Sequence, residues 1–370
     1  MTSKTQIRYR PIEQPALQNI EGPVDLSRET METRRKKTLN AMEKEKLDFL
    51  IIYGDREHGD NFEYLTGFAP RFEEGALVVG RDGRAALLLG NESLRMSGYS
   101  RIEAEAVQVP CFSLPNQPME NERDLREIFR ELGIQENSRV GMAGWKMFTS
   151  KINHNPDTLE VPCFIAEAVK GITSHVRNAT GLFIHPLTGI RIRKNANEIA
   201  HYEFGAALAS QCVKRLMDKI QVGITEMELA GELAVYGQPP TVQAICATGE
   251  RFTKGIVAPR MKGTALGDRF TTTMGLKGGL TCRAGYIARS EEDLPEGEKD
   301  YIDRIVKPYV WTMAKWYSSM GVGVRAADLY HLIEQEAPRD KYGWRLNPGH
   351  YTAGGGVGIL TYVSRLPGGV

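Results

Sequence analysis

The chain has 370 residues, of which 41% are hydrophobic and 25% are charged, and its formal net charge is +1. This composition is typical of a soluble globular protein, and the length suits two domains. A nearly neutral chain without a basic stripe gives no reason to expect a nucleic-acid partner, and no apolar run is long enough to predict a membrane span. The 5 cysteines lack metal-ligand spacing, so we expect free thiols and a cytoplasmic protein.

Residues 1–27 are polar and contain Pro11, Pro15 and Pro23. They predict an arm that either packs partly against the body or forms a loose tail, and both alternatives stay open. Ser27 is a candidate N-cap for a helix that ends near Lys46. The basic run at residues 34–37 is interpreted as the solvated face of this helix.

Residues 28–185 are predicted to form an α/β domain with a mixed sheet. Residues 47–53 read as a buried strand, and Asp82-Gly83 lies between two short apolar segments as in a β-hairpin. Helix and strand patterns then alternate to about residue 164. A linker is expected near residues 180–189, and a second domain over residues 190–370.

The second domain is predicted to begin with two helices. Asn195 can cap the first of them, with Glu198 three residues later, and Thr225 can cap the second, with Glu228 in the same relation. A strand at residues 245–249 follows. Residues 298–320 and 326–336 have helical patterns, and residues 344–352 read as extended.

A β-hairpin is predicted within the stretch from Gly263 to Arg289. Residues 268–274 are rich in β-branched and aromatic side chains, the Lys-Gly-Gly of residues 277–279 supplies a turn, and residues 280–287 return. Alternate side chains of two paired strands share a face, so such a hairpin can direct residues from both strands at one point.

These patterns resemble the superfamily of creatinase, prolidase, aminopeptidase P and methionine aminopeptidase, which has the "pita-bread" fold. The resemblance rests on residues 61–68 (Asn-Phe-Glu-Tyr-Leu-Thr-Gly-Phe), on residues 191–199 with Arg191, Lys194 and Glu198, on residues 223–230, and on Gly267-Asp268 at the start of the hairpin. It implies a creatinase-like α/β domain followed by an antiparallel sheet with flanking helices. The final residues contain no acidic side chain, so we expect this second domain to be incomplete at its carboxy-terminal end.

The resemblance implies a two-metal centre, in which each hairpin strand contributes one aspartate. In this chain those positions fall at Thr273 and Arg283. A cation repels a divalent metal, and threonine is a poor ligand for a hard metal ion. We therefore expect no metal and no other cofactor.

Creatinase, which works without a metal, is the family member that suggests an enzymatic role. Lys254 falls where the resemblance implies a histidine proton shuttle, and its alternative is a solvated surface lysine. His350 follows a glycine as a family ligand does, and its alternative is a structural hydrogen-bond donor. Arg71 resembles a substrate-binding arginine supplied by a partner subunit, and its alternative is a surface arginine in a loop. Arg283 and Tyr286 are the other predicted substrate-binding residues.

Further arginines at positions 260, 269 and 289 suggest a basic pocket for a carboxylate, if Arg269 and Arg283 face the same way. Cys246 and Cys282 are expected to be inert thiols, and the acidic residues 291–293 a solvated turn.

Three functions stay open at this point. The first is metal-independent hydrolysis of a C–N bond in a small anionic substrate. The second is a catalytically inactive binding or interaction module, and the third is a truncated Xaa-Pro aminopeptidase or prolidase. The expected partners are a small-molecule or short-peptide substrate and a second copy of the chain in a homodimer.

Overall fold

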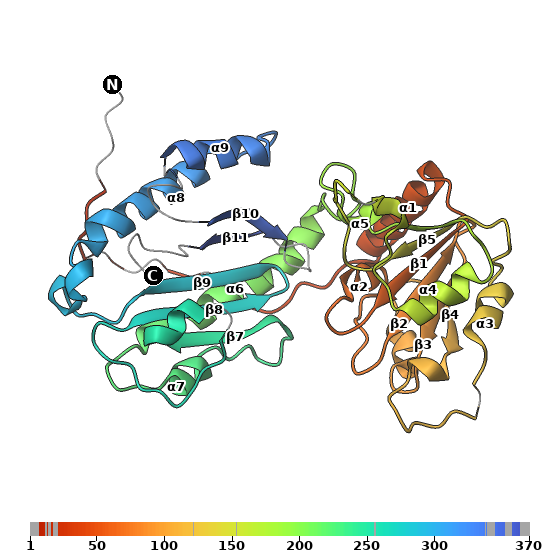
Figure 1. Cartoon of the computed structure of the whole chain (residues 1–370), viewed down its shortest axis with the longest axis horizontal. Coiled ribbons are helices and arrows are strands. Elements are labelled where there is room, and N and C mark those ends of the chain that lie inside the picture. The colour runs from red at the N-terminus through yellow and green to blue at the C-terminus, as the bar shows by residue number, and fades with distance from the viewer. Residues whose placement is uncertain are drawn as a thin grey trace. The chain divides into compact units, whose positions relative to one another are not determined.

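The computed structural model describes residues 7–11, 13, 16–17, 21–120, 122–152, 154–254, 257–336, 338, 345–351 and 357–362. The chain forms two compact units (Figure 1). The amino-terminal unit comprises Asp25–Ile199, and the carboxy-terminal unit comprises Ala200–Val370 together with Met1–Val24. The division falls just inside the long helix α6 (Ala196–Asp218), whose first residues belong to the amino-terminal unit.

The amino-terminal unit is built on a six-stranded mixed sheet with the order β4-β3-β2-β1-β5-β6. β1 pairs with β2 and β2 with β3 in antiparallel fashion, whereas β5 is parallel to β1 and β6, and β4 is parallel to β3. The strands are β1 (Phe49–Gly54), β2 (Gly75–Gly80), β3 (Ala85–Leu89), β4 (Glu105–Gln108), β5 (Val140–Ala143) and β6 (Val176–Asn178). The predicted mixed α/β domain is confirmed.

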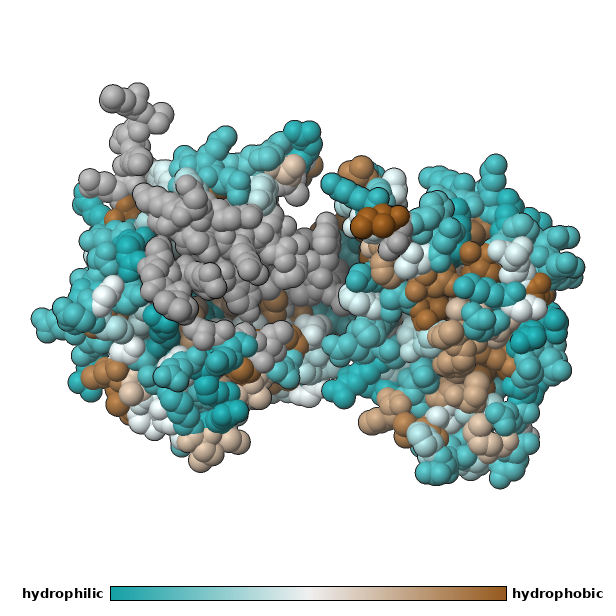
Figure 2. All heavy atoms as spheres, in the orientation of Figure 1, coloured by the Kyte–Doolittle hydropathy of each residue, from teal (hydrophilic) through white to brown (hydrophobic). Residues whose placement is uncertain are grey.

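Helices cover both faces of this sheet, because alternate strand residues are apolar on each face. Leu50 and Ile52 of β1 pack with α1 (Arg28–Lys44), α2 (Asp60–Thr66) and α5 (Gly181–Ile184). Ile51 lies on the other face, with α3 (Leu125–Glu131) and α4 (Cys163–Lys170). The visible surface shows apolar side chains in small groups among hydrophilic ones, including a group over α4 (Figure 2).

The carboxy-terminal unit contains the predicted hairpin. β8 (Arg269–Leu276) and β9 (Gly279–Tyr286) pair in antiparallel fashion, and β7 (Pro240–Thr248) adds a third strand beside β8. α6 and α7 (Glu226–Gly231) pack on one face of this sheet through an apolar core (Figure 1). β10 (Arg345–Tyr351) and β11 (Val357–Tyr362) form a separate antiparallel pair, and β11 lies against β9. This arrangement confirms the predicted fold class.

The tip of the hairpin packs closely on α6, and this contact explains its glycines. Gly278 has a φ of +111°, and a Cβ there would lie 1.8 Å from the carbonyl oxygen of Tyr202. From the helix side, a Cβ at Gly205 would lie 1.9 Å from the carbonyl oxygen of Lys277. Only glycine allows the two backbones to approach so closely, so the turn residues fix the hairpin against the helix.

The predicted helix at residues 298–320 is interrupted. A π-helical turn spans Ile302–Val306, and α8 (Lys307–Ser319) follows with Pro308 in its first turn. Proline cannot donate a backbone hydrogen bond, which accounts for the wider turn before it. α9 (Ala326–Glu336) comes next.

In the predicted amino-terminal arm, the described residues form no helix or strand, and the carbonyl oxygen of Val24 lies 2.6 Å from Nδ1 of His201.

Candidate functional site

The register of the hairpin decides which side chains of β8 and β9 can act together. Thr273 is opposite Cys282, and its hydroxyl donates to the Cys282 sulfur at 3.3 Å. Arg283 is opposite Thr272 instead. Opposed residues share a face and successive residues alternate, so Thr273 and Arg283 lie on opposite faces. The two positions that the resemblance implies for the aspartates are therefore one residue out of register with each other, and such a shift moves a side chain to the other face.

The same alternation separates the two predicted substrate-binding residues of β9. Thr272, which is fully buried, lies on the face that packs against α6, and Arg283 shares that face at an exposed position. Tyr286 lies on the face of Thr273, where its hydroxyl accepts a hydrogen bond from Nε of Arg269 at 3.3 Å. Arg283 therefore cannot join Tyr286 or Arg269 in one basic pocket on that face.

Tyr286 contacts the residues that precede α8, through its ring and through its partner Arg269. Its ring meets that of Tyr301 edge-on at 5.0 Å. Arg269 forms an ion pair with Glu298 at 3.8 Å, and Arg304 pairs with the same carboxylate at 2.6 Å. Arg269 therefore already has an anionic partner, Glu298, which it shares with Arg304.

The donor set of the hairpin does not fit a two-metal centre. Thr273 and Cys282 lie opposite each other on the two paired strands. Burial raises the pKa of the Cys282 thiol, so the sulfur stays protonated at neutral pH. A hydroxyl and a neutral thiol are poor ligands for hard cations, which require carboxylate oxygens. Over the part of the chain that the structure describes, no three His, Cys, Asp or Glu side chains gather where they could hold a metal ion.

The remaining predicted residues lie on separate elements. Lys254 ends the short 3₁₀ helix Gly249–Lys254 and is exposed. His350 lies in β10 with its backbone opposite Gly358, and its side chain falls outside the described residues. Arg71 is exposed in the amino-terminal unit, beside Phe72, whose φ is +69°. Among Lys254, Arg283 and Tyr286, whose side chains are described within the carboxy-terminal unit, no hydrogen bond or ion pair joins any two.

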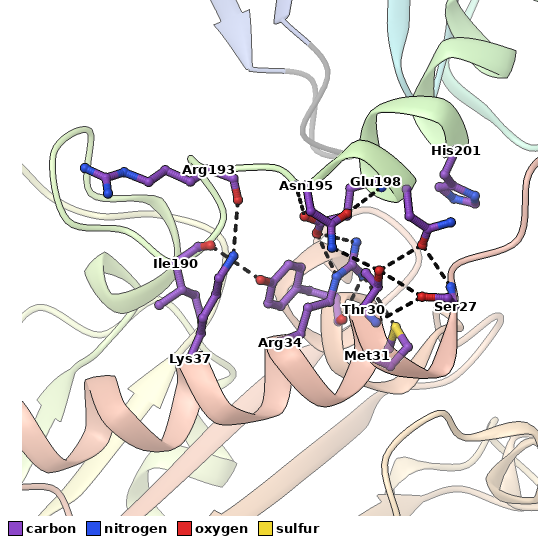
Figure 3. Close-up of polar contacts among 12 residues, drawn as sticks. Ser27, Thr30, Met31, Arg34, Lys37, Ile190, Arg193, Asn195, Glu198 and His201 are labelled. Atoms are coloured by element: carbon purple, nitrogen blue, oxygen red, sulfur yellow. Dashed lines mark hydrogen bonds and ion pairs between the residues drawn. The ribbon is translucent and has the colours of Figure 1, made fainter. Parts of the chain in front are cut away.

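A buried ion pair in the amino-terminal unit was missed by the sequence analysis (Figure 3). Nη2 and Nε of Arg34 lie 2.8 and 2.9 Å from Oε1 of Glu198, and each of the two side chains is only 2% exposed. Nη1 of Arg34 donates to the carbonyl oxygen of Tyr64 at 3.0 Å, and the guanidinium lies 4.3 Å from the centre of the Tyr64 ring.

The interpretation of residues 34–37 as a solvated face is therefore wrong for Arg34. Thr30, Arg34 and Thr38 recur every four residues and are all buried, so they form the inner face of α1. The signal that could have found the pair is this spacing, together with a glutamate at the start of α6.

Glu198 also confirms the predicted capping box. Its Oε2 accepts from the backbone N–H of Asn195 at 3.0 Å, while Oδ1 of Asn195 accepts from the N–H of Glu198 at 2.8 Å (Figure 3). Beside it, burial lowers the pKa of Lys194 to about 8. Nη1 of Arg191 donates to Asn61 at 2.6 Å. The two motifs at residues 61–68 and 191–199 thus pack together, and their role is to anchor the start of α6.

With this geometry established, comparison with known proteins identifies the fold. Residues 34–154 match the creatinase/prolidase N-terminal domain family. Most of the amino-terminal unit is therefore similar to the creatinase/prolidase N-terminal domain. Together with the solved structures described next, this match confirms the predicted resemblance to the creatinase, aminopeptidase P and prolidase superfamily. No curated protein matches the sequence.

Solved structures share the fold over most of the chain. An Xaa-Pro dipeptidase from Bacillus anthracis is 16% identical with a TM-score of 0.63, and the match covers 90% of this chain and 84% of that one. A prolidase from Pyrococcus horikoshii is 18% identical with a TM-score of 0.63, covering 86% and 81%. An X-Pro aminopeptidase from Thermotoga maritima is 13% identical with a TM-score of 0.60, covering 85% and 81%. Such low identities establish the shared architecture and leave the chemistry to be argued from this chain's own residues.

Among the described residues, no helix is long and apolar enough to cross a membrane.

Proposed function

We propose that this chain is a hydrolase of the creatinase and Xaa-Pro peptidase superfamily that acts without a metal centre on a C–N bond of a small anionic or short peptide substrate. The observation that carries the proposal is that neither facing pair of the hairpin at these positions, Thr273 with Cys282 or Thr272 with Arg283, contains a carboxylate. The superfamily fold supports the hydrolase class, and the side chains of the hairpin support the metal-independent form.

Hydrolysis of such a bond requires two proton transfers. Water loses a proton as its oxygen attacks the carbon, the C–N bond breaks, and the leaving nitrogen takes up a proton. We propose Lys254 and His350 for these transfers, with Tyr286 on the face of Thr273 and Arg71 as a binding group for the substrate carboxylate. A homodimer in the cytoplasm, in which the partner subunit supplies Arg71, is part of the same proposal.

Elemental analysis and a substrate screen test this function together. We expect purified protein to contain no stoichiometric manganese, zinc or cobalt, and to hydrolyse a ureido, amidino or Xaa-Pro compound equally well with and without a chelator. Lys254→Ala should reduce kcat by at least about 100-fold, the usual size of a general acid–base contribution. The matched control is Lys170→Ala, which removes an exposed lysine from the end of α4 and should leave turnover unchanged.

A second candidate function is ligand binding without turnover. It is favoured by the raised pKa of the Cys282 thiol and by the exposure of Lys254, since neither group is in an environment that activates it. Calorimetric titration with the same compounds distinguishes the two, because binding without product formation by folded protein would overturn the hydrolase proposal.

The truncated Xaa-Pro peptidase is the third candidate. Turnover of Xaa-Pro compounds that appears only on adding manganese and disappears with a chelator would support it over both others.

A further inference from the structure

A buried carboxylate in the carboxy-terminal unit joins both ends of the segment that carries Lys254. Glu226, the first residue of α7, is fully buried. Its Oε1 accepts from the backbone N–H and the hydroxyl of Thr248, at 2.8 and 3.0 Å. Its Oε2 accepts from the backbone N–H of Arg260 at 3.0 Å and from Nη1 of Arg251. Four donors thus fill the acceptor sites of one carboxylate.

Arg251 extends this network across the segment. While Nη1 contacts Glu226, Nη2 donates to the carbonyl oxygen of Ala258 at 2.5 Å. The side chain of Arg251 therefore bridges the carboxylate and the far end of the segment from Arg251 to Arg260. Lys254 lies between these two anchoring points and is exposed.

The hydrogen bonds around Glu226 favour the charged form of its carboxylate. Burial by itself would raise the pKa of Glu226, but hydrogen bonds from Thr248, Arg251 and Arg260 outweigh it and hold the pKa below its ordinary value. On the other side of Thr248, Nζ of Lys262 donates to the Thr248 hydroxyl at 2.8 Å and to Asp268 at 2.9 Å. The network thereby connects the end of β7 to the start of β8.

We propose that Glu226 is a positioning residue: by binding Arg251 and the backbone of Arg260, it holds the 3₁₀ helix Gly249–Lys254 in place and so determines where the amine of Lys254 lies. This inference rests on the proposed function for the role of Lys254 in proton transfer. It adds a residue that acts through its hydrogen bonds with Thr248, Arg251 and the backbone of Arg260, without touching the substrate.

Hydrogen exchange measured by mass spectrometry on the full chain tests the anchor itself. Glu226→Gln keeps the size of the side chain but removes its charge, and we expect amides of residues 249–254 and 257–260 to exchange about tenfold faster or more. Arg251→Gln, which leaves Glu226 its other three donors, should do the same with less risk to folding. The matched control is Glu228→Gln on the same helix, because Glu228 caps only Thr225 and should leave this segment unchanged. Unchanged exchange in both test variants would overturn the inference.

Kinetics then separate positioning from simple structural support. On a substrate identified by the screen, Glu226→Gln should lower kcat about tenfold or more with KM nearly unchanged, and Glu226→Asp should restore part of it. Faster exchange with an unchanged kcat would refute the positioning role while the hydrolase proposal stands. If the wild-type chain turns over no compound, the proposed function fails, and the exchange experiment alone decides whether Glu226 fixes the segment.

Discussion

Removing the charge of Arg34 should destabilise the amino-terminal unit strongly. In Arg34→Met, Glu198 would remain buried at 2% exposure without its cation, and the hydrogen bond to the carbonyl oxygen of Tyr64 would be lost. Breaking a buried ion pair by removing one partner costs about 3–5 kcal/mol, because the other charge stays desolvated. For a unit of this size, each kcal/mol corresponds to roughly 2–4 °C in Tm, so we expect a fall of about 6–20 °C.

Native-state hydrogen exchange in rising urea provides the assay. Peptides from β1 and β5 report the amino-terminal unit by itself, which avoids treating two units as one two-state transition. Lys36→Met is the matched control, since Lys36 belongs to the same basic run but is exposed, and its effect should stay within about 0.5 kcal/mol. The double variant Arg34→Met/Glu198→Met should be less destabilised than the sum of the single changes. Equal effects at positions 34 and 36 would refute the argument.

Three further predictions concern the carboxy-terminal unit. Gly278→Ala should lower the unfolding free energy by about 2–4 kcal/mol, because alanine must adopt a positive φ and its Cβ meets the Tyr202 carbonyl. The control is Gly285→Ala, where a Cβ finds open space, and it should change the unfolding free energy by less than about 1 kcal/mol. Equal losses for the two variants in urea unfolding would contradict this prediction. Burial raises the pKa of the Cys246 thiol to about 12 from a value of 9.0, so folding favours the neutral thiol. The contribution of this thiol to the unfolding free energy is complete below pH 9 and is lost as the pH rises toward 12. Cys246→Ala should therefore make the unfolding free energy fall less steeply between pH 9 and 12. The same pH dependence in wild type and variant would count against this prediction. Thr225→Ala removes the cap of α7 and should lower the unfolding free energy by about 1 kcal/mol, measured by thermal unfolding. If the variant is as stable as the wild type, the capping box does not stabilise the helix.

Several features of this protein follow from local sequence chemistry. The N-caps Ser27, Asn195 and Thr225 were predictable because each side chain satisfies backbone donors within three residues. The hairpin was predictable from β-branched residues around a glycine turn. The superfamily resemblance likewise depended on short linked patterns, which the fold confirms.

Other features depended on contacts that the sequence does not encode locally. A single residue of register places Cys282, and not Arg283, opposite Thr273, because the pairing of two strands is set by their turn and by packing on α6. Arg34 and Glu198 are 164 positions apart in the chain, so only the packing of α1 against the start of α6 shows that they form a buried pair.

The sequence by itself therefore determined the order of the elements, their caps and the class of fold, since these depend on neighbouring residues. Only the tertiary structure decided which charges are buried and which side chains share a face of the hairpin. Burial and facing are properties of surfaces brought together from distant parts of the chain, and no local pattern specifies them.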